Sequence, residues 1–196
     1  ESYNGSAWTE VNDLNTGRTE LGGAGTNTSA LAFGGETPSV TANTEQWNGT
    51  NWTEVNNLNT GRSILAGSGA SNTSALAFGG YNNPVGTYAF TELWNGTNWA
   101  EVNDMNTPRG GLAGCGTQTA ALAFGSIQPV TYHYAETWNG TNWTIVNDTN
   151  SDMGLRGGAG TNTSALAFGG QPYSTGATES WNGTNWTELA DLSTAR

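Results

Sequence analysis

The chain contains no lysine, one cysteine and one histidine in 196 residues. The single cysteine, Cys115, has no partner for an intrachain disulfide. No apolar run approaches the roughly 18 residues that a membrane-spanning helix needs, so we expect no membrane insertion. The net charge is −11 and the only basic residues are five arginines plus the lone His133. Such a surface repels phosphate groups, so we expect neither nucleic acid nor an anionic membrane as a partner.

What the chain has in abundance is one repeated phrase. The sequence Trp-Asn-Gly-Thr-Asn-Trp occurs at 47–52, 94–99, 138–143 and 181–186, and a weaker copy occupies residues 3–8. The second Trp recurs after steps of 44, 47, 44 and 43 residues. A period of this size indicates one supersecondary unit that is repeated along the chain.

Each unit is predicted to contain four short strands, named a to d in chain order. In the first full unit these are the Gly-rich segment 21–25, the apolar run 29–33 that ends at Gly34-Gly35, the segment 44–47 and the segment 51–55. Asn48-Gly49 between the last two predicts a hairpin with a type I′ turn. The two Trp of each unit and the Phe that ends strand b are expected to be core residues first and a ligand platform second.

One four-stranded sheet of this kind has two apolar faces and cannot stand alone, but radial stacking of the sheets covers both faces. The sequence therefore predicts an all-β fold, a β-propeller of four-stranded blades. Strand a is expected to be innermost, because bulky side chains do not fit where the blades crowd together at the axis.

The unit resembles the Kelch repeat. The resemblance rests on Gly-Gly after strand b, an aromatic residue at the end of strand c, a Trp at the start of strand d and an Arg that closes the unit. It extends over essentially the whole chain, although the third unit reads Gly125-Ser126 instead of Gly-Gly. In the fourth unit ungapped counting places Met153 at the arginine position and Arg156 at the position of Leu21, so the arginine role is not expected to transfer to Arg156. Kelch domains bind proteins, bind sugars or form enzyme scaffolds, so the resemblance implies a fold and leaves the function open.

The two halves of the unit are not equal in number. There are four a–b pairs but five c–d pairs, because residues 1–18 form an extra half-blade before the repeats 19–62, 63–109, 110–156 and 157–196. We expect a single repeat domain with a ring of about four or five blades, and our hypothesis is a ring of about five blades whose missing a–b half lies outside this chain. The alternatives are a segment of a longer array, a spare c–d hairpin that pairs with another molecule, and a four-bladed ring with a surplus flap.

The repeats differ most in the loops between strands b and c, at 36–44, 81–91, 127–135 and 171–178. These loops contain five of the six tyrosines, four of the five prolines and the only histidine. Tyrosine suits binding loops because it is amphipathic and loses little entropy on ordering. We therefore predict a recognition face, against the alternative of neutral loop drift, and its candidate ligand-binding residues are Tyr81, Tyr88, Tyr132, His133, Tyr134 and Tyr173.

Catalysis finds little support in the sequence. The acids that recur in every unit, such as Glu54 and Asp104, are expected on the surface or in turns, because an active site needs a unique constellation. Cys115 is expected to be a small buried residue and not a nucleophile, and we expect no catalytic residue, no metal and no cofactor, since the chain has no Cys-His cluster and no phosphate-binding loop before a helix.

The favoured function is therefore a non-enzymatic binding or display propeller with a glycan or protein partner. Near-identical tandem units, the lack of lysine and the heavy use of Asn, Thr and Gly resemble repetitive Kelch-like proteins of marine phages and bacteria, which implies an extracellular or virion surface location. One alternative is a purely structural assembly unit that self-associates through the unpaired half-blade. The other is an enzyme propeller of glycosidase-like or oxidase-like type, for which only Tyr132-His133-Tyr134 offers a faint signal.

Overall fold

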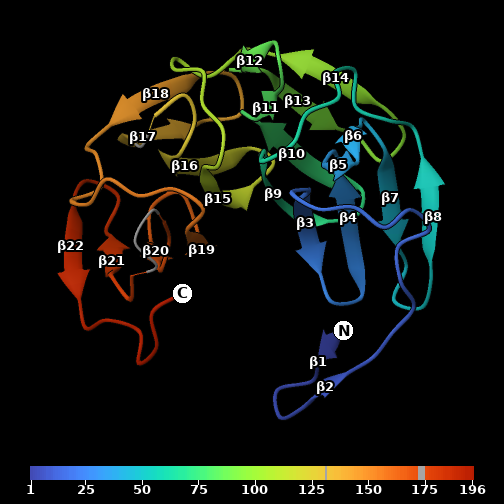
Figure 1. Ribbon diagram of the computed structural model, residues 1–196, viewed down its shortest axis with the longest axis horizontal. Coiled ribbons are helices and arrows are strands. Elements are labelled where there is room, and N and C mark those ends of the chain that lie inside the picture. The colour runs from blue at the N-terminus through green and yellow to red at the C-terminus, as the bar shows by residue number, and fades with distance from the viewer. Residues whose placement is uncertain (131, 172–174) are drawn as a thin grey trace.

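The computed structural model describes residues 1–130, 132–171 and 175–196, with Tyr132 described through its backbone. Every secondary-structure element assigned within these residues is a β-strand. Four four-stranded antiparallel sheets form the blades of a β-propeller around a common axis (Figure 1). No helix in this part of the chain is long and apolar enough to cross a membrane. The predicted all-β propeller is confirmed.

Each blade runs in the order a, b, c, d, with consecutive strands as antiparallel neighbours. Blade one consists of β3 (Gly22–Thr26), β4 (Ser29–Phe33), β7 (Thr44–Trp47) and β8 (Trp52–Val55). Blade two consists of β9 (Ala66–Ser71), β10 (Ser74–Phe78), β13 (Thr91–Trp94) and β14 (Trp99–Val102). Blade three consists of β15 (Ala113–Thr117), β16 (Ala120–Ser126), β17 (Tyr132–Trp138) and β18 (Trp143–Val146). Blade four consists of β19 (Gly157–Gly160), β20 (Ala165–Phe168), β21 (Thr178–Trp181) and β22 (Trp186–Leu189).

Three smaller hairpins complete the described strands. Residues near the N-terminus form the N-terminal hairpin, β1 (Ser2–Tyr3) with β2 (Trp8–Thr9). Two of the b–c loops contain hairpins of their own, β5 (Glu36–Thr37) with β6 (Ser39–Val40) and β11 (Tyr81–Asn82) with β12 (Gly86–Thr87). The surplus c–d pair that the repeat count predicted is the N-terminal hairpin.

The Gly-rich strand a is innermost, as predicted. β3 packs against β9, β9 against β15, and β15 against β19. At this crowded axis a Cβ atom on Gly67 would lie 2.5 Å from the Phe33 ring and 2.6 Å from the carbonyl oxygen of Gly23. Only glycine fits at such a distance, which explains why the strand nearest the axis is poor in side chains.

Aromatic side chains fill the layer between consecutive blades. The Phe that ends strand b of one blade packs against the second Trp of the next, with ring centroids 5.0 Å apart for Phe33–Trp99, 4.9 Å for Phe78–Trp143 and 5.1 Å for Phe124–Trp186. These three Phe residues are fully buried and the three Trp residues are buried. The prediction that these aromatics are core residues is confirmed, and we call these three layers the closed interfaces.

Buried ion pairs cross from one unit to the next at the outer side of each blade. An Arg that ends one unit reaches the Glu on strand c of the following blade, in the pairs Arg18–Glu45, Arg62–Glu92, Arg109–Glu136 and Arg156–Glu179, at 2.5–2.8 Å. The other oxygen of each carboxylate accepts the backbone and side-chain amides of an Asn from the same connection, as Asn59 shows for Glu92 at 2.7 and 2.8 Å. Each pair therefore ties the connection that enters a blade to the third strand of that blade.

The expectation for Arg156 is wrong. Its guanidinium lies 2.8 Å from Glu179, and both side chains are buried like those of the other pairs. Arg156 lies three residues beyond the position that the closing Arg has in the other units. Its side chain still reaches the equivalent carboxylate, because a flexible side chain with four rotatable bonds can enter the site from a nearby backbone position. Ungapped counting aligns backbone positions, whereas the ion pair depends on where the guanidinium arrives.

The predicted type I′ turn is also wrong. In the segment 48–51 only Gly49 has a positive φ, at 93°, whereas a type I′ turn at Asn48-Gly49 needs positive φ at both residues. The Asn48 side chain accepts the backbone amides of Thr50 and Asn51 at 2.9 Å each. Asn48 therefore caps the turn through its side chain, and its backbone has a negative φ.

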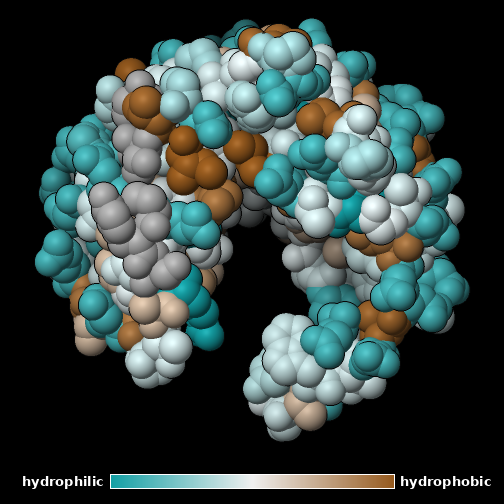
Figure 2. All heavy atoms as spheres, viewed as in Figure 1, coloured by the Kyte–Doolittle hydropathy of each residue, from teal (hydrophilic) through white to brown (hydrophobic). Residues whose placement is uncertain are grey.

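The ring is open between blade four and blade one. Figure 2 shows a gap through the molecule there, and both chain termini face it in Figure 1. The N-terminal hairpin stands beside the gap, next to blade one. We call this sector the open gap.

Candidate functional site

Shortly before strand a of each blade, one residue near the axis has a left-handed backbone conformation. These residues are Glu20 (φ 57°), Ile64 (φ 44°), Gly111 (φ 69°) and Leu155 (φ 50°). Backbone hydrogen bonds connect them in series, from Ile64 to the carbonyl of Glu20 at 2.9 Å, from Gly111 to Ile64 at 2.8 Å and from Leu155 to Gly111 at 2.7 Å. The series holds one end of the axis together and fixes the direction of each side chain.

Ile64 carries the greatest backbone strain of this series. A β-branched residue with positive φ is a rare outlier, and a strained conformation of this kind costs about 1–3 kcal/mol. Glycine meets the same backbone requirement in unit three, at Gly111. The fold alone therefore does not require isoleucine at this position.

Three of these residues, Glu20, Ile64 and Leu155, line a cavity of about 590 Å³ together with residues of the b–c loops. It lies where loops of blades one, two and three meet at the axis, and we call it the axial pocket. Its lining includes apolar side chains, amides, one tyrosine and two carboxylates: Ile64, Ile127, Leu155, Val40, Asn82, Asn83, Gln128, Tyr81, Glu20 and Glu36. No described residue that lines it is basic. Figure 2, drawn from the side of the β5–β6 and β11–β12 hairpins, shows hydrophobic side chains gathered on the inner rim over β15 and β16.

The mixture of groups defines what the axial pocket can hold. Its volume falls in the range of small-molecule sites, which combine an apolar lining with a few convergent polar groups. Amide and hydroxyl groups can donate to and accept from hydroxyl-rich ligands, while two carboxylates disfavour anions. The pocket is therefore suited to a neutral or cationic ligand with several hydrogen-bonding groups.

Of the six residues predicted from the sequence, Tyr81 lines the axial pocket. Tyr88 stacks on Phe90 with ring centroids 4.7 Å apart, and it does not line this cavity. Tyr132 lies in β17, where its backbone pairs with Ser126. Tyr173 lies outside the described residues. The tyrosines described here do not gather in one site.

Tyr134 lines a different cavity, of about 490 Å³, with Arg109, Glu136 and Asp148. Burial lowers the pKa of the Arg109 guanidinium, while the adjacent Glu136 carboxylate opposes this change. Both charged groups already serve the buried ion pair between blades two and three. This second cavity is thus lined largely by groups of the fold's framework.

His133 is a half-exposed residue held between two carboxylates. Its Nε2 atom lies 3.5 Å from Asp148, and its Nδ1 atom contacts Asp152. The ring meets Tyr134 edge-on at 5.7 Å. Within the described residues no group of three or more His, Cys, Asp and Glu side chains is arranged to hold a metal ion. His133 therefore belongs to a surface hydrogen-bond network and does not reach the axial pocket.

Cys115 is buried, and burial raises the pKa of its thiol to about 11. A thiol of this kind is protonated at neutral pH and a poor nucleophile. The prediction of a small buried residue is confirmed. The recurring acids Glu54, Glu101 and Glu188 on strand d are exposed, as expected.

The sequence reading missed the apolar residues of the axial pocket. Ile64, Leu155 and Ile127 were not candidates, because isolated aliphatic residues look like ordinary core residues. A signal was present nonetheless. The position two residues after the closing Arg reads Glu20, Ile64 and Gly111 in the first three units, while the strands around it stay nearly constant.

No protein-family model matches the chain, and no curated protein matches it. Among solved structures it is similar to that of YjhT, with a TM-score of 0.77 over 93% of this chain and 68% of that chain. The sequence identity is 10%. At this identity the likeness supports the propeller fold and carries no statement about activity.

Proposed function

We propose that this chain is a non-enzymatic recognition propeller built from Kelch-like repeats, and that it binds a neutral, hydroxyl-rich ligand such as a glycan in the axial pocket. A surface location on a cell or a virion, where such ligands are encountered, is part of the proposal. The observation that carries it is the convergence of three variable b–c loops on one cavity whose lining differs from blade to blade.

The contrast with the repeated framework supports this choice. Residues that serve the fold recur, as the Arg–Glu pair does in all four blades and the Phe–Trp contact does at all three closed interfaces. Residues of the axial pocket do not recur, and three of them, Glu20, Ile64 and Leu155, keep a strained backbone. Strain that persists where glycine would serve the fold is typical of positions retained for binding.

The charge of the lining favours a neutral ligand over an acidic one. Glu20 and Glu36 both line the axial pocket, and the chain as a whole has a net charge of −11. A sulfated or sialylated glycan or an acidic peptide would meet repulsion at this face. A neutral glycan can use the amides of Asn82 and Gln128 and pack an apolar ring face on Tyr81.

The experiment is a screen of neutral and acidic glycans against the purified chain and its Tyr81→Ala variant. We expect binding of neutral glycans, and loss of about tenfold or more in affinity when Tyr81 is truncated, which is the size of effect that an aromatic contact in a binding site produces. Tyr134→Ala is the matched control, since Tyr134 lies in β17 and lines a cavity other than the axial pocket. If no glycan binds, or if both variants lose binding equally, the proposal is wrong.

A further inference from the structure

The open gap has two faces, and the closed interfaces show what would cover each of them. At a closed interface the Leu and Phe of strand b face the next blade, and Leu31, Leu76 and Leu122 are at most 1% exposed. Across from them lie the Ala residues and the Trp pair of the following blade. Every closed interface therefore joins a Leu/Phe face to an Ala/Trp face.

Both faces are present at the open gap, but neither is covered by a neighbouring blade. On blade four, Leu166 takes the place of Leu122 but is 41% exposed, and Phe168 is half-buried. On blade one, Trp52 takes the place of Trp99 but is half-buried, because no Phe lies against it. The unfilled space beside Trp52 is a cavity of about 730 Å³.

The N-terminal hairpin supplies the outer half of a fifth blade at this position. Tyr3 pairs with Trp8 as Trp47 pairs with Trp52, and the ring centroids are 5.2 and 5.3 Å apart in the two pairs. The Asn4 side chain caps the turn by accepting two backbone amides, as Asn48 does. The hairpin is therefore a c–d hairpin in its geometry and its turn.

The hairpin is also connected to blade one by the bonds of a closed interface. Asn12 donates to the Thr50 carbonyl at 2.9 Å and to the Asn51 side chain, and the later residues Asn56, Asn103 and Asn147 make the same pair of bonds to the blades that follow them. Arg18 completes the connection through its ion pair with Glu45. What is absent beside blade one is the inner, a–b half of the blade.

The other side of the gap carries matching changes. Ala190 stands at the position of Asn12, and Ala7 stands at the position of Asn51. If blade four and the N-terminal hairpin are neighbours in a closed ring, these two alanines face each other where every closed interface has an Asn–Asn hydrogen bond. Replacing both residues removes the donor and the acceptor of the Asn–Asn bond together, whereas replacing one would leave the other Asn side chain without this partner. Arg196 and Glu1 occupy the positions of Arg62 and Glu92 across this same boundary.

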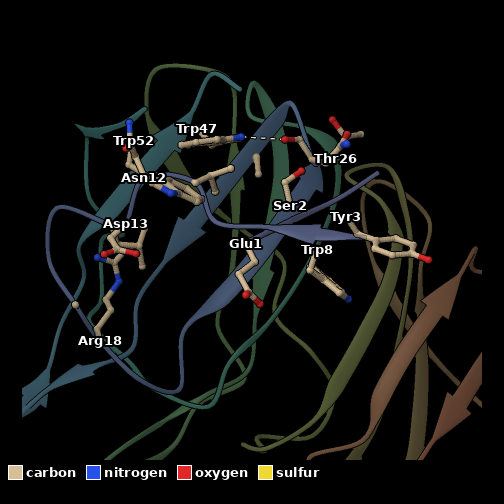
Figure 3. Close-up of a pocket in the computed structure, with 15 residues that line it drawn as sticks. Glu1, Ser2, Tyr3, Trp8, Asn12, Asp13, Arg18, Thr26, Trp47 and Trp52 are labelled. Atoms are coloured by element: carbon tan, nitrogen blue, oxygen red, sulfur yellow. Dashed lines mark hydrogen bonds between the residues drawn. The ribbon is translucent and has the colours of Figure 1, made fainter. Parts of the chain in front are cut away.

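Figure 3 shows the cavity between blade one and the N-terminal hairpin. Trp47 and Trp52 line it from blade one, and Glu1, Tyr3 and Trp8 line it from the N-terminal hairpin. In complete blades strand b occupies the equivalent place and pairs with strand c over four residues, as β4 does with β7. The shape of this cavity and the unpaired edge of β1 both correspond to a two-stranded segment.

We propose that the open gap is a docking site for a β-hairpin of the a–b type, with a Gly- and Ala-rich inner strand and an outer strand of the pattern Leu-x-Phe. The Phe stacks on Trp52, the outer strand extends the sheet of β1, and its Ala face covers Leu166 and Phe168. The hairpin completes a five-bladed ring. A second copy of this chain is not the occupant, because each described a–b hairpin already forms the inner half of a blade of its own.

The test uses a synthetic peptide with the sequence of residues 19–35, which contains one a–b hairpin with its Gly-Gly end. We expect saturable one-to-one binding to the full chain, a blue shift of tryptophan emission as Trp52 becomes buried, and a rise in Tm. A control peptide with Leu31→Ser and Phe33→Ser should bind about tenfold more weakly or not at all, because it lacks the two large apolar side chains.

Two exposed positions of the chain provide matched variants. Leu166→Arg places a charge on the face of the open gap and should weaken peptide binding about tenfold or more, since a charge cannot be buried there without a partner. Ile145→Arg makes the same change at a site that is 63% exposed on β18, away from the gap, and should leave binding unchanged. Tyr81→Ala should also leave it unchanged, which separates this test from that of the axial pocket.

Three results would overturn the inference. The first is no binding of the peptide by a folded chain, and the second is equal binding of the control peptide. The third is a dimer, measured by sedimentation, that Leu166→Arg converts to a monomer while the peptide neither binds nor dissociates it, because a second copy would then cover the gap.

Discussion

The closed interfaces and the axial pocket are built from the same repeated unit but follow opposite rules. At the closed interfaces the same residue types recur at the same places. Each Phe contacts a Trp of the next blade, and each strand-c Glu pairs with the Arg that ends the preceding unit. In the axial pocket the equivalent left-handed backbone positions carry different side chains, Glu20, Ile64 and Leu155. Packing between blades therefore requires the same residue type at a position in every repeat, whereas a pocket shared by several blades requires a particular residue in one repeat only.

The open gap extends the comparison, because it presents the residues of a closed interface without their partners. The sharpest test is therefore to make one substitution in both settings. Phe78→Ala removes a fully buried ring and should lower the free energy of unfolding by about 3–5 kcal/mol. Phe168→Ala removes a ring that is only half-buried and should cost roughly half as much. Urea denaturation of both variants measures the difference, and equal losses would mean that the open gap is covered in solution.

The buried ion pairs provide the second test. Glu45→Gln leaves the buried guanidinium of Arg18 with a neutral partner and should cost about 2–3 kcal/mol of unfolding free energy. Glu54→Gln on the neighbouring strand is the control, because Glu54 is exposed and its loss should change stability by less than about 0.5 kcal/mol. A loss at Glu45 no larger than that at Glu54 would show that the pair does not hold the interface.

The same carboxylate predicts a pH dependence. Burial by itself raises the pKa of Glu45, but hydrogen bonds from Asn15, Arg18 and Thr16 outweigh it and place the pKa below its ordinary value. A depressed pKa in the folded state means that the stabilisation is fully present above the ordinary pKa of about 4.3 and is lost as the pH falls through the folded value. Stability of the wild type should therefore decrease below that pH, and the Glu45→Gln variant should lose less between neutral and acid pH.

The smallest effect is a gain. Trp99 and Trp143 donate from Nε1 to the hydroxyls of Thr44 and Thr91, at 3.1 and 2.9 Å. Trp186 Nε1 is buried without a hydrogen-bond partner in the described part of the chain, because unit three has Ala135 at the threonine position. Ala135→Thr should restore the bond and raise the free energy of unfolding by about 1 kcal/mol. Ala123→Thr, at a buried site that needs no hydroxyl, is the control and should destabilise the protein.

Much of the fold could be predicted from the sequence because a propeller is a repeated local pattern. The period, the Gly-rich inner strand and the Phe and Trp positions follow from strand alternation and crowding at the axis, and each copy repeats the same signal. The type of the turn between strands c and d was not predicted correctly. The turn at Asn48-Gly49 was assigned from a dipeptide, although the Asn48 side chain selects the turn type through hydrogen bonds that its neighbours Thr50 and Asn51 donate.

The candidate site was predicted only in part. Tyr81 was found because tyrosine in a variable loop is conspicuous, and it does line the axial pocket. Tyr134 falls in a predicted b–c loop as well, but in the structure it lies in β17 and lines another cavity. The remaining side chains of the pocket come from three units, and no spacing along the chain shows that loops so far apart meet at the axis.

The repeat, the four strands of each unit and the aromatic residues of the blade interfaces follow from the amino-acid sequence, because contacts between equivalent positions recur with the period of the repeat. Three features appear only in the folded chain: Arg156 reaches Glu179, Ile64 and Leu155 share a pocket with Tyr81, and the unpaired half of the repeat stands beside an open gap. These features depend on where side chains arrive in space when the blades are wrapped around an axis, and that arrangement has no counterpart in the order of residues along the chain.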